Sequence, residues 1–272
     1  MVKRKIMNGK NSLSMNRHLI YTALIGEKYD NLMTLSAIDE RFDYICFVRK
    51  GDKQCDYVGN WRIVELECVS EDNVRLSRYP KLVPHKTEVA KYEYSIYIDA
   101  NINITGEDIY NRFFELVEKD VHIALLKHPF RDCVYQEAYV CIAALKGGWF
   151  DIIRQIVSLR MSGVKSHLGL YEANFIFRKQ NSPEIVKLGE LWWKTFKKYS
   201  KRDQLSLIYS LHKTNIIPNY FLEPGYTTRN HPSLEKVQHN KQVSSAKDCF
   251  KRRVVSILYC IFKPLLKEDL EK

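Results

Sequence analysis

The chain has 272 residues, of which 45% are hydrophobic and 28% are charged, a balance that is typical of folded globular proteins and excludes disordered and collagenous chains. No apolar run reaches about 18 residues, which excludes a transmembrane helix. The net charge is +11, but residues 1–18 carry +5 of it and residues 245–272 carry +3, so the body of the chain lacks the basic groove of a nucleic-acid-binding protein.

The sequence divides into a basic N-terminal tail (1–17), one domain (18–244) and a basic C-terminal tail (245–272). Short apolar runs predict strands at 18–25, 42–48, 61–66, 94–99, 121–126 and 173–177. Helical periodicity predicts helices at 107–119, 135–145, 149–160, 183–196 and 202–212. Ser182, Pro183 and Glu184 form a helix start, with a cap, a proline in the first turn and an acid facing the dipole. Alternating strands and helices indicate an α/β fold with a mostly parallel central sheet flanked by helices.

The first chemical motif along the chain is basic. Arg75, Arg78 and Lys81 are three residues apart and His85 follows. On a helix the first three would form one cationic stripe, able to hold phosphates or a sugar carboxylate. A solvated helix face is the alternative.

The next motif is YSIYIDAN at 94–101, a buried strand that ends in Asp99, Ala100 and Asn101. Ligands of open α/β sheets bind at the carboxyl ends of strands. The oxygens of Asp99 and Asn101 suit Mg²⁺ or Mn²⁺ that also holds a diphosphate. A strand end with a simple Asx turn is the alternative.

Two further groups follow predicted strands. Lys127, His128, Arg131 and Glu137 are dense in charge and should again lie at the carboxyl edge of the sheet, unless they form only a salt-bridged loop. Asp203 and Gln204 open a helix, where an acid can also serve only the helix dipole.

The C-terminal tail has basic residues at 251–253, an apolar stretch at 254–262 and further lysines. We expect a basic amphipathic helix that lies in a membrane interface, or that packs on its own domain or a second subunit. The seven cysteines are odd in number and lack C-x-x-C spacing, which argues against a disulfide framework or a zinc ribbon. We expect a cytoplasmic location, on the inner face of the membrane if the tail binds lipid.

These motifs together resemble the glycosyltransferase-like domain of the plant mucilage and rhamnogalacturonan galacturonosyltransferases and their bacterial relatives. The resemblance covers roughly residues 18–225. Its motifs are Gly26-x-x-Tyr29-Asp30, the run 43–47, the basic series 75–85, the strand end 94–101, the loop 127–137 and Arg202 to Ser206. The pattern is also similar to the retaining glycogenin-type transferases, with the difference that Asp-Ala-Asn replaces Asp-x-Asp.

The resemblance implies a GT-A fold, a nucleotide-sugar donor (in particular a UDP-sugar), Mn²⁺ or Mg²⁺, and transfer with retention to a glycan or lipid-linked glycan in surface polysaccharide, capsule or lipopolysaccharide synthesis. The catalytic candidates are Asp203 and Gln204, and loss of Asp203 should lower turnover with little effect on the fold. The metal candidates are Asp99, Asn101 and His231. The donor-binding candidates are Tyr21, Thr22, Ala23, Arg75, Arg78, Lys81, His85, Asp99, Ala100, Lys127, His128, Arg131 and Glu137.

Two alternatives stay open at this point. One is a catalytically degenerate domain that binds without transfer, because the Asp-Ala-Asn motif has one carboxylate where the relatives have two. The other is a nucleic-acid-binding protein that uses the basic tails, although no recognition motif is present. The acceptor, the sugar and the oligomeric state do not follow from the sequence.

Overall fold

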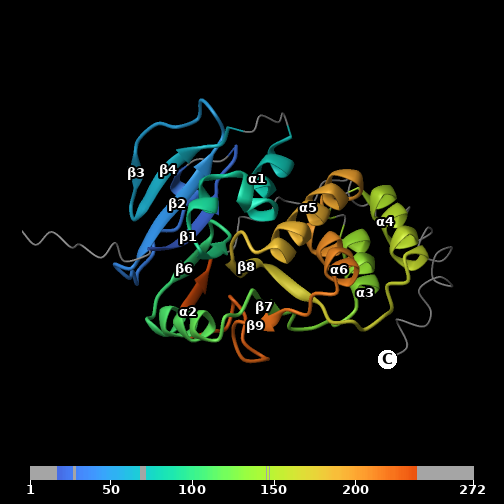
Figure 1. Ribbon diagram of the computed structural model, residues 1–272. Coiled ribbons are helices and arrows are strands. Elements are labelled where there is room, and N and C mark those ends of the chain that lie inside the picture. The colour runs from blue at the N-terminus through green and yellow to red at the C-terminus, as the bar shows by residue number, and fades with distance from the viewer. Residues whose placement is uncertain (1–16, 27–28, 68–71, 145, 147, 238–272) are drawn as a thin grey trace, which may run out of the picture.

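The computed structural model describes residues 17–26, 29–67, 72–144, 146 and 148–237. An eight-stranded sheet lies at its centre, in the order β3-β4-β2-β1-β5-β8-β7-β9, and β6 pairs with β10 in a small second sheet (Figure 1). The strands are β1 (His18–Ala23), β2 (Phe42–Val48), β3 (Tyr57–Val58), β4 (Trp61–Glu65), β5 (Tyr94–Ile98), β6 (Ile102–Ile104), β7 (Ile123–Lys127), β8 (Tyr171–Lys179), β9 (Asn219–Tyr220) and β10 (Leu234–Lys236).

The helices are α1 (Asn73–Leu82), α2 (Asp108–Glu118), α3 (Val134–Ala143), α4 (Trp149–Met161), α5 (Pro183–Lys198) and α6 (Asp203–Thr214), with short 3₁₀ helices η1 (Tyr29–Asn31), η2 (Pro84–Lys86) and η3 (Glu88–Lys91). In the large sheet β1, β2, β4, β5, β7 and β9 run in one direction, and β3 and β8 run against them. The prediction of a mostly parallel sheet flanked by helices is therefore confirmed. The C-terminal amphipathic helix lies outside the described residues.

Two hydrophobic cores cover the two faces of the sheet. Because side chains alternate along a strand, Leu19 and Tyr21 of β1 enter one core and Ile20 enters the other. The first core joins the sheet to α1, α3, α4, α5 and α6, and the second joins it to α2 and the β6–β10 pair. Figure 1 shows α2 and β6 on the side of the sheet opposite to α5 and α6.

Helix α1 packs closely on α5 because one residue of α5 lacks a side chain. A Cβ built on Gly189 would lie 2.6 Å from the backbone oxygen of Leu82. The first turn of α5 begins at Pro183 as expected, but the hydroxyl of Ser182 donates to the Lys179 oxygen at 3.2 Å and does not cap the helix. The Gly189 contact fixes how near α1 comes to α5.

We expect Gly189→Ala to destabilise the protein by about 1–3 kcal/mol, because the backbone of Leu82 must move to admit the methyl group. Lys187→Ala on the exposed face of α5 is the control, and it should leave stability nearly unchanged. Urea unfolding of both variants measures the difference. Equal unfolding midpoints for Gly189→Ala and the parent would show that α1 and α5 can separate freely.

Candidate active site

A cavity of about 370 Å³ opens where β1 and β5 end. The chain passes from β1 to β2 on one side and later adds β5 on the other side of β1, so this is a topological switch point of the sheet. Crevices at such points are where open α/β sheets bind ligands. The cavity is lined by Ala23, Leu24, Ile25, Gly26, Asn73, Val74, Ser77, Arg78, Tyr97, Asp99, Ala100 and Asn101.

The start of α1 forms one wall of this cavity. The side chain of Asp72 caps the helix, accepting from the amide nitrogens of Val74 at 3.0 Å and Arg75 at 3.3 Å. Opposite it, Gly26 has φ of 72°, and a Cβ there would lie 2.1 Å from Nδ2 of Asn73. The loop after β1 therefore approaches α1 more closely than any other residue would allow.

The cationic stripe meets an acid from a different part of the chain. Lys81 forms a hydrogen bond with the carboxylate of Asp203, and Nε of Arg78 lies 3.6 Å from the same oxygen. Burial raises the pKa of Asp203, but the charges of Lys81 and Arg78 outweigh burial and hold that pKa well below its usual value. The acid is thus ionised, and it holds both cations beside the cavity that Arg78 lines.

The beginning of α6 is fixed on several sides. Nε1 of Trp192 donates to the backbone oxygen of Asp203 at 2.8 Å, and Nε2 of Gln204 donates to the backbone oxygen of Tyr171 at 2.7 Å. Oδ1 of Asp203 accepts from the Gln204 amide nitrogen at 3.1 Å. Since Lys81 is only 2% exposed and depends on this carboxylate, we now expect that loss of Asp203 also destabilises the fold.

Asp99 and Asn101 flank the floor of the cavity. Tyr97 donates its hydroxyl to Oδ1 of Asp99 at 3.0 Å, and burial followed by the charge of Asp99 raises the pKa of Tyr97 well above its usual value. Nδ2 of Asn101 donates to the backbone oxygen of Val237 at 2.7 Å. Asp99 is the one carboxylate among the residues that line the cavity.

His231, the third predicted metal ligand, contacts Ser233 and the start of α2. Nδ1 of His231 accepts from the Ser233 amide nitrogen at 3.2 Å, and its Nε2 lies 3.7 Å from Oδ2 of Asp108 at the start of α2. The described residues contain no group of three or more His, Cys, Asp or Glu side chains that could hold a metal ion. A lysine, Lys236, instead lies within electrostatic reach of Asp99, whose charge opposes the lowering of the Lys236 pKa by burial. The described cavity wall therefore offers a divalent metal one carboxylate, Asp99, and a cation lies near it.

The predicted loop residues line a second hollow, of about 680 Å³, and not the cavity at β1 and β5. Lys127, His128 and Arg131 lie on its wall. Beneath them the buried carboxylate of Glu137 accepts from Arg131, whose Nε and Nη2 lie at 2.9 Å and 2.7 Å. Nη2 of Arg202 lies 3.8 Å from the other oxygen of Glu137, which links this hollow to the beginning of α6.

Besides the loop residues, five donor-binding candidates do not line the cavity: Tyr21, Thr22, Arg75, Lys81 and His85. Tyr21 and Thr22 are fully buried within β1, and only Ala23 of that series reaches the cavity wall. Nη1 of Arg75 lies 3.0 Å from Oδ2 of Asp72. Nε2 of His85 lies 2.9 Å from the Glu190 carboxylate. The stripe on α1 is therefore divided, with Arg78 and Lys81 at the site and Arg75 outside it.

Sequence reasoning missed two cations near the site, the buried Arg178 and the half-buried Lys236. Nη1 of Arg178 donates to the backbone oxygen of Lys81 at 2.6 Å, and burial lowers the pKa of Arg178. Lys236 comes from the three-residue strand β10, which has no periodicity to detect. Arg178 lies in the apolar run of β8, where its charge is the only signal that could have singled it out.

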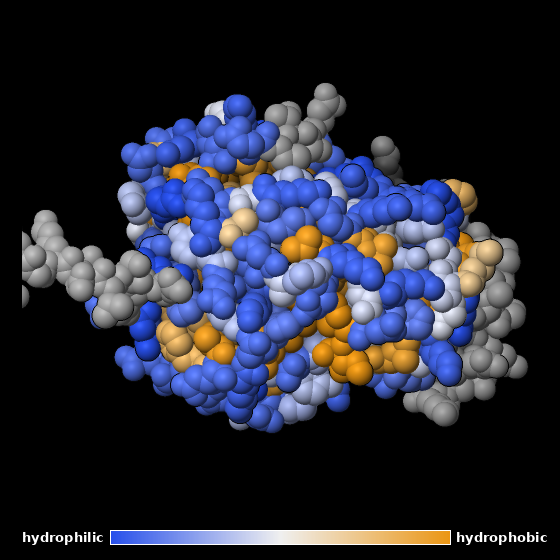
Figure 2. Space-filling view, in the orientation of Figure 1, coloured by the Kyte–Doolittle hydropathy of each residue, from blue (hydrophilic) through white to orange (hydrophobic). Residues whose placement is uncertain are grey.

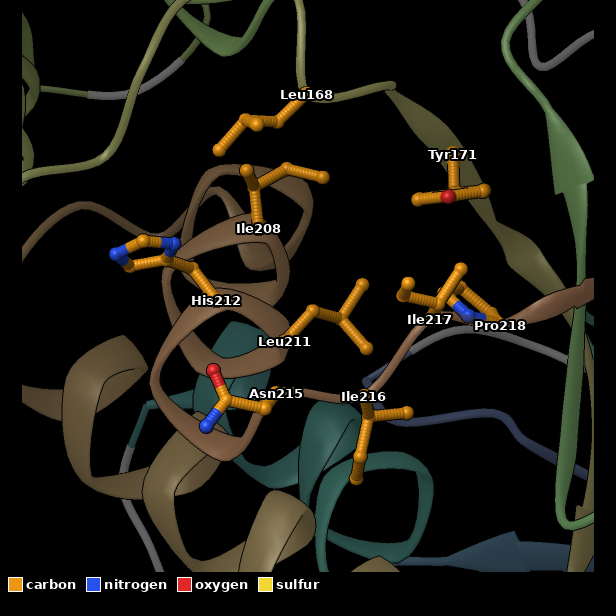
Figure 3. Close-up of a pocket in the computed structure, with 9 residues that line it drawn as sticks. All are labelled: Leu168, Tyr171, Ile208, Leu211, His212, Asn215, Ile216, Ile217 and Pro218. Atoms are coloured by element: carbon orange, nitrogen blue, oxygen red, sulfur yellow. The ribbon is translucent and has the colours of Figure 1, made fainter.

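A separate cavity of about 340 Å³ has a different character (Figure 3). Ile208, Leu211, Ile216 and Ile217 line it from α6 and the segment that follows, and Figure 3 shows His212 and Asn215 at its edge. Figure 2 shows hydrophobic residues gathered over the region of α6 and β9, and Ile217 is 88% exposed. The wall carries no acidic or basic side chain other than His212, so this cavity does not suit a nucleotide diphosphate.

Comparison with known proteins agrees with the family that the motifs indicated. Residues 26–225 match the model of the TOD1/MUCI70 glycosyltransferase-like domain. The chain belongs to this family. The TOD1/MUCI70 match includes β2, β4, β5 and the whole of α1 to α6. It also includes the residues that line the cavity at β1 and β5, except Ala23, Leu24 and Ile25. Family membership supports glycosyl transfer as the activity.

Among solved structures, the chain is similar to the apo form of mouse xyloside xylosyltransferase 1, at 7% sequence identity and a TM-score of 0.46. The similarity covers 84% of this chain and 99% of the mouse chain. No curated protein matches the sequence. Within the described ranges, none of the helices is both long and apolar enough to cross a membrane.

Proposed function

We propose that this protein transfers a sugar from a nucleotide-sugar, most specifically a UDP-sugar, to a hydroxyl group of a glycan acceptor. One observation carries the proposal beyond the family: the cavity at the β1–β5 switch point has Arg78 in its wall, with Lys81 and Asp203 behind it. A polar crevice with fixed cations suits a diphosphate joined to a sugar.

In the proposed reaction the bond between the anomeric carbon and the diphosphate oxygen breaks, and its electron pair leaves with UDP. The acceptor hydroxyl oxygen bonds to the anomeric carbon from the same face, and its proton passes to the departing phosphate oxygen. Arg78 and Lys81 stabilise the charge that develops on the diphosphate, and Asp203 positions them. Gln204 holds the beginning of α6 against β8 beside the sugar. These roles are assigned to side chains of the protein and not to the Mn²⁺ or Mg²⁺ that the resemblance implies.

A panel of nucleotide-sugars, followed by thermal shift and by release of free nucleotide, tests this function. We expect one UDP-sugar to raise the melting temperature and to be slowly hydrolysed. No response to any nucleotide would favour the degenerate binding domain. The anomeric configuration of the product, read by NMR, tests retention.

The cavity itself is tested by filling it. Ser77 lies on α1 at the cavity wall, and we expect Ser77→Trp to weaken UDP-sugar binding by about tenfold or more because the indole occupies the space of the ligand. Val157→Trp on the exposed face of α4 is the matched control and should bind like the parent. Calorimetric titration compares the two variants, and equal affinities would place the donor elsewhere.

We also propose that the acceptor is a lipid-linked glycan of a surface polysaccharide, capsule or lipopolysaccharide, and that residues 245–272 bring the enzyme to the inner face of the membrane. This tail lies outside the described residues, and the support is its basic and apolar composition. Sedimentation with anionic liposomes, with and without residues 245–272, tests the contact. Failure of the intact chain to sediment would remove this part of the proposal.

A further inference from the structure

We propose that the donor diphosphate is bound without a divalent metal and that the ammonium group of Lys236 takes the place of that cation beside Asp99. The inference rests on the proposed function and deepens it. It assigns a binding role to a residue outside the stretch of the chain that matches the family model, which ends at residue 225.

Backbone pairing brings Lys236 to the cavity. Strand β10 runs antiparallel to β6, with Lys236 opposite Ile102. The Val237 amide nitrogen donates to the backbone oxygen of Asn101 at 3.0 Å, and Nδ2 of Asn101 donates back to the Val237 oxygen at 2.7 Å. Lys236 is therefore held next to the Asp99–Asn101 turn, which forms the cavity floor.

The charged groups that act on Lys236 lie around the same cavity end as Asp99. Burial is the strongest influence on the pKa of Lys236 and lowers it, the carboxylates of Asp99 and Glu172 raise it, and Arg229 and Lys81 lower it. Arg229 is itself paired with Glu172. A half-buried lysine of this kind supplies a point charge that a phosphate can bind.

A divalent metal at Asp99 would have one carboxylate ligand from the cavity wall and would be repelled by Lys236, with Arg78 and Lys81 nearby. A diphosphate would gain from all three cations. When the bond to the sugar breaks, the negative charge that forms on the phosphate oxygen is stabilised by fixed ammonium and guanidinium groups. A divalent metal and the ammonium group of Lys236 would therefore repel each other at this end of the cavity, and in our proposal the lysine supplies the positive charge.

Calorimetric titration of the full-length protein with UDP, in EDTA and in Mn²⁺, tests the inference. We expect the same affinity within about twofold in both buffers. Lys236→Met should weaken UDP binding by about tenfold or more, since a hydrogen bond to a charged group is lost, and Mn²⁺ should not restore it. Lys236→Arg should retain most of the affinity. Lys213→Met, whose ammonium contacts the Ser162 oxygen at the far end of α6, is the control.

Three results would overturn the inference. Binding of UDP only in the presence of Mn²⁺ would leave the transferase proposal standing and return the metal to Asp99. Unchanged UDP affinity in Lys236→Met, with an unfolding temperature like that of the parent, would remove Lys236 from the site. If wild-type protein binds neither UDP nor any other nucleoside diphosphate in either buffer, the proposed function fails and the inference fails with it.

Discussion

Asp203→Asn is expected to lower transfer by at least about 100-fold and to lower stability by about 3–5 kcal/mol. Both effects have one origin. The carboxylate of Asp203 neutralises Lys81, which is buried, and holds Arg78 at the cavity wall. An amide leaves the ammonium group of Lys81 buried without a counter-charge, and it releases Arg78 from its position. Steady-state kinetics and thermal unfolding of the same preparation measure the two losses.

A second variant separates catalysis from folding. In Lys81→Met/Asp203→Asn the buried charge is removed together with its partner, and replacement of a buried ion pair by neutral groups is often close to neutral for stability. We expect the double variant to recover most of the unfolding temperature and none of the activity. Undiminished turnover in a folded Asp203→Asn protein would show that the Asp203 carboxylate has no role in sugar transfer.

Glu137→Gln is the second change with a large expected effect. Glu137 is buried and accepts from Arg131 at 2.7 Å, with Arg202 at 3.8 Å from its other oxygen and His128 at 3.9 Å. A neutral amide leaves a cluster of cations around a buried position, at a cost of about 3–5 kcal/mol. For a domain of this size that corresponds to a fall in melting temperature of roughly 10 °C.

The matched control for this change is Glu190→Gln. Glu190 also contacts two basic groups, Lys86 at 2.5 Å and His85 at 2.9 Å, but its side chain is 44% exposed. Exposed pairs contribute at most about 1 kcal/mol. Differential scanning calorimetry should therefore show a large shift for Glu137→Gln and a small one for Glu190→Gln. Similar shifts in melting temperature for the two variants would mean that burial does not increase the contribution of Glu137 to stability.

The long elements of the fold could be predicted from the sequence because their patterns are local. The strand before Asp99 has no exposed position, and α5 repeats its apolar residues at helical spacing. The positions of the strand end at Asp99 and the helix start at Asp203 therefore follow from local sequence patterns. The contact that joins the start of α6 to α1 at the cavity is a distant pair, Lys81 with Asp203, whose members are 122 residues apart.

The parts that sequence reasoning missed depend on long-range pairing. Strands β6 and β10 have three residues each, too few to show alternation, and they exist because they pair with each other. Lys127, His128 and Arg131 follow a strand as predicted, but β8 lies between β7 and β5, so they line a different hollow. Strand order decides this, and strand order is not encoded in spacing along the chain.

The pairing of β10 with β6 also bears on how homology delimits a functional unit. The family match ends at residue 225, whereas the antiparallel ladder that carries Lys236 ends eleven residues later. At the other end, β1 begins at His18, eight residues before the match begins. A recombinant fragment cut at the homology limits would lose both the central strand of the sheet and the lysine at its cavity. The stretch that matches the family model is thus shorter than the part of the chain that builds the sheet and the surroundings of the cavity.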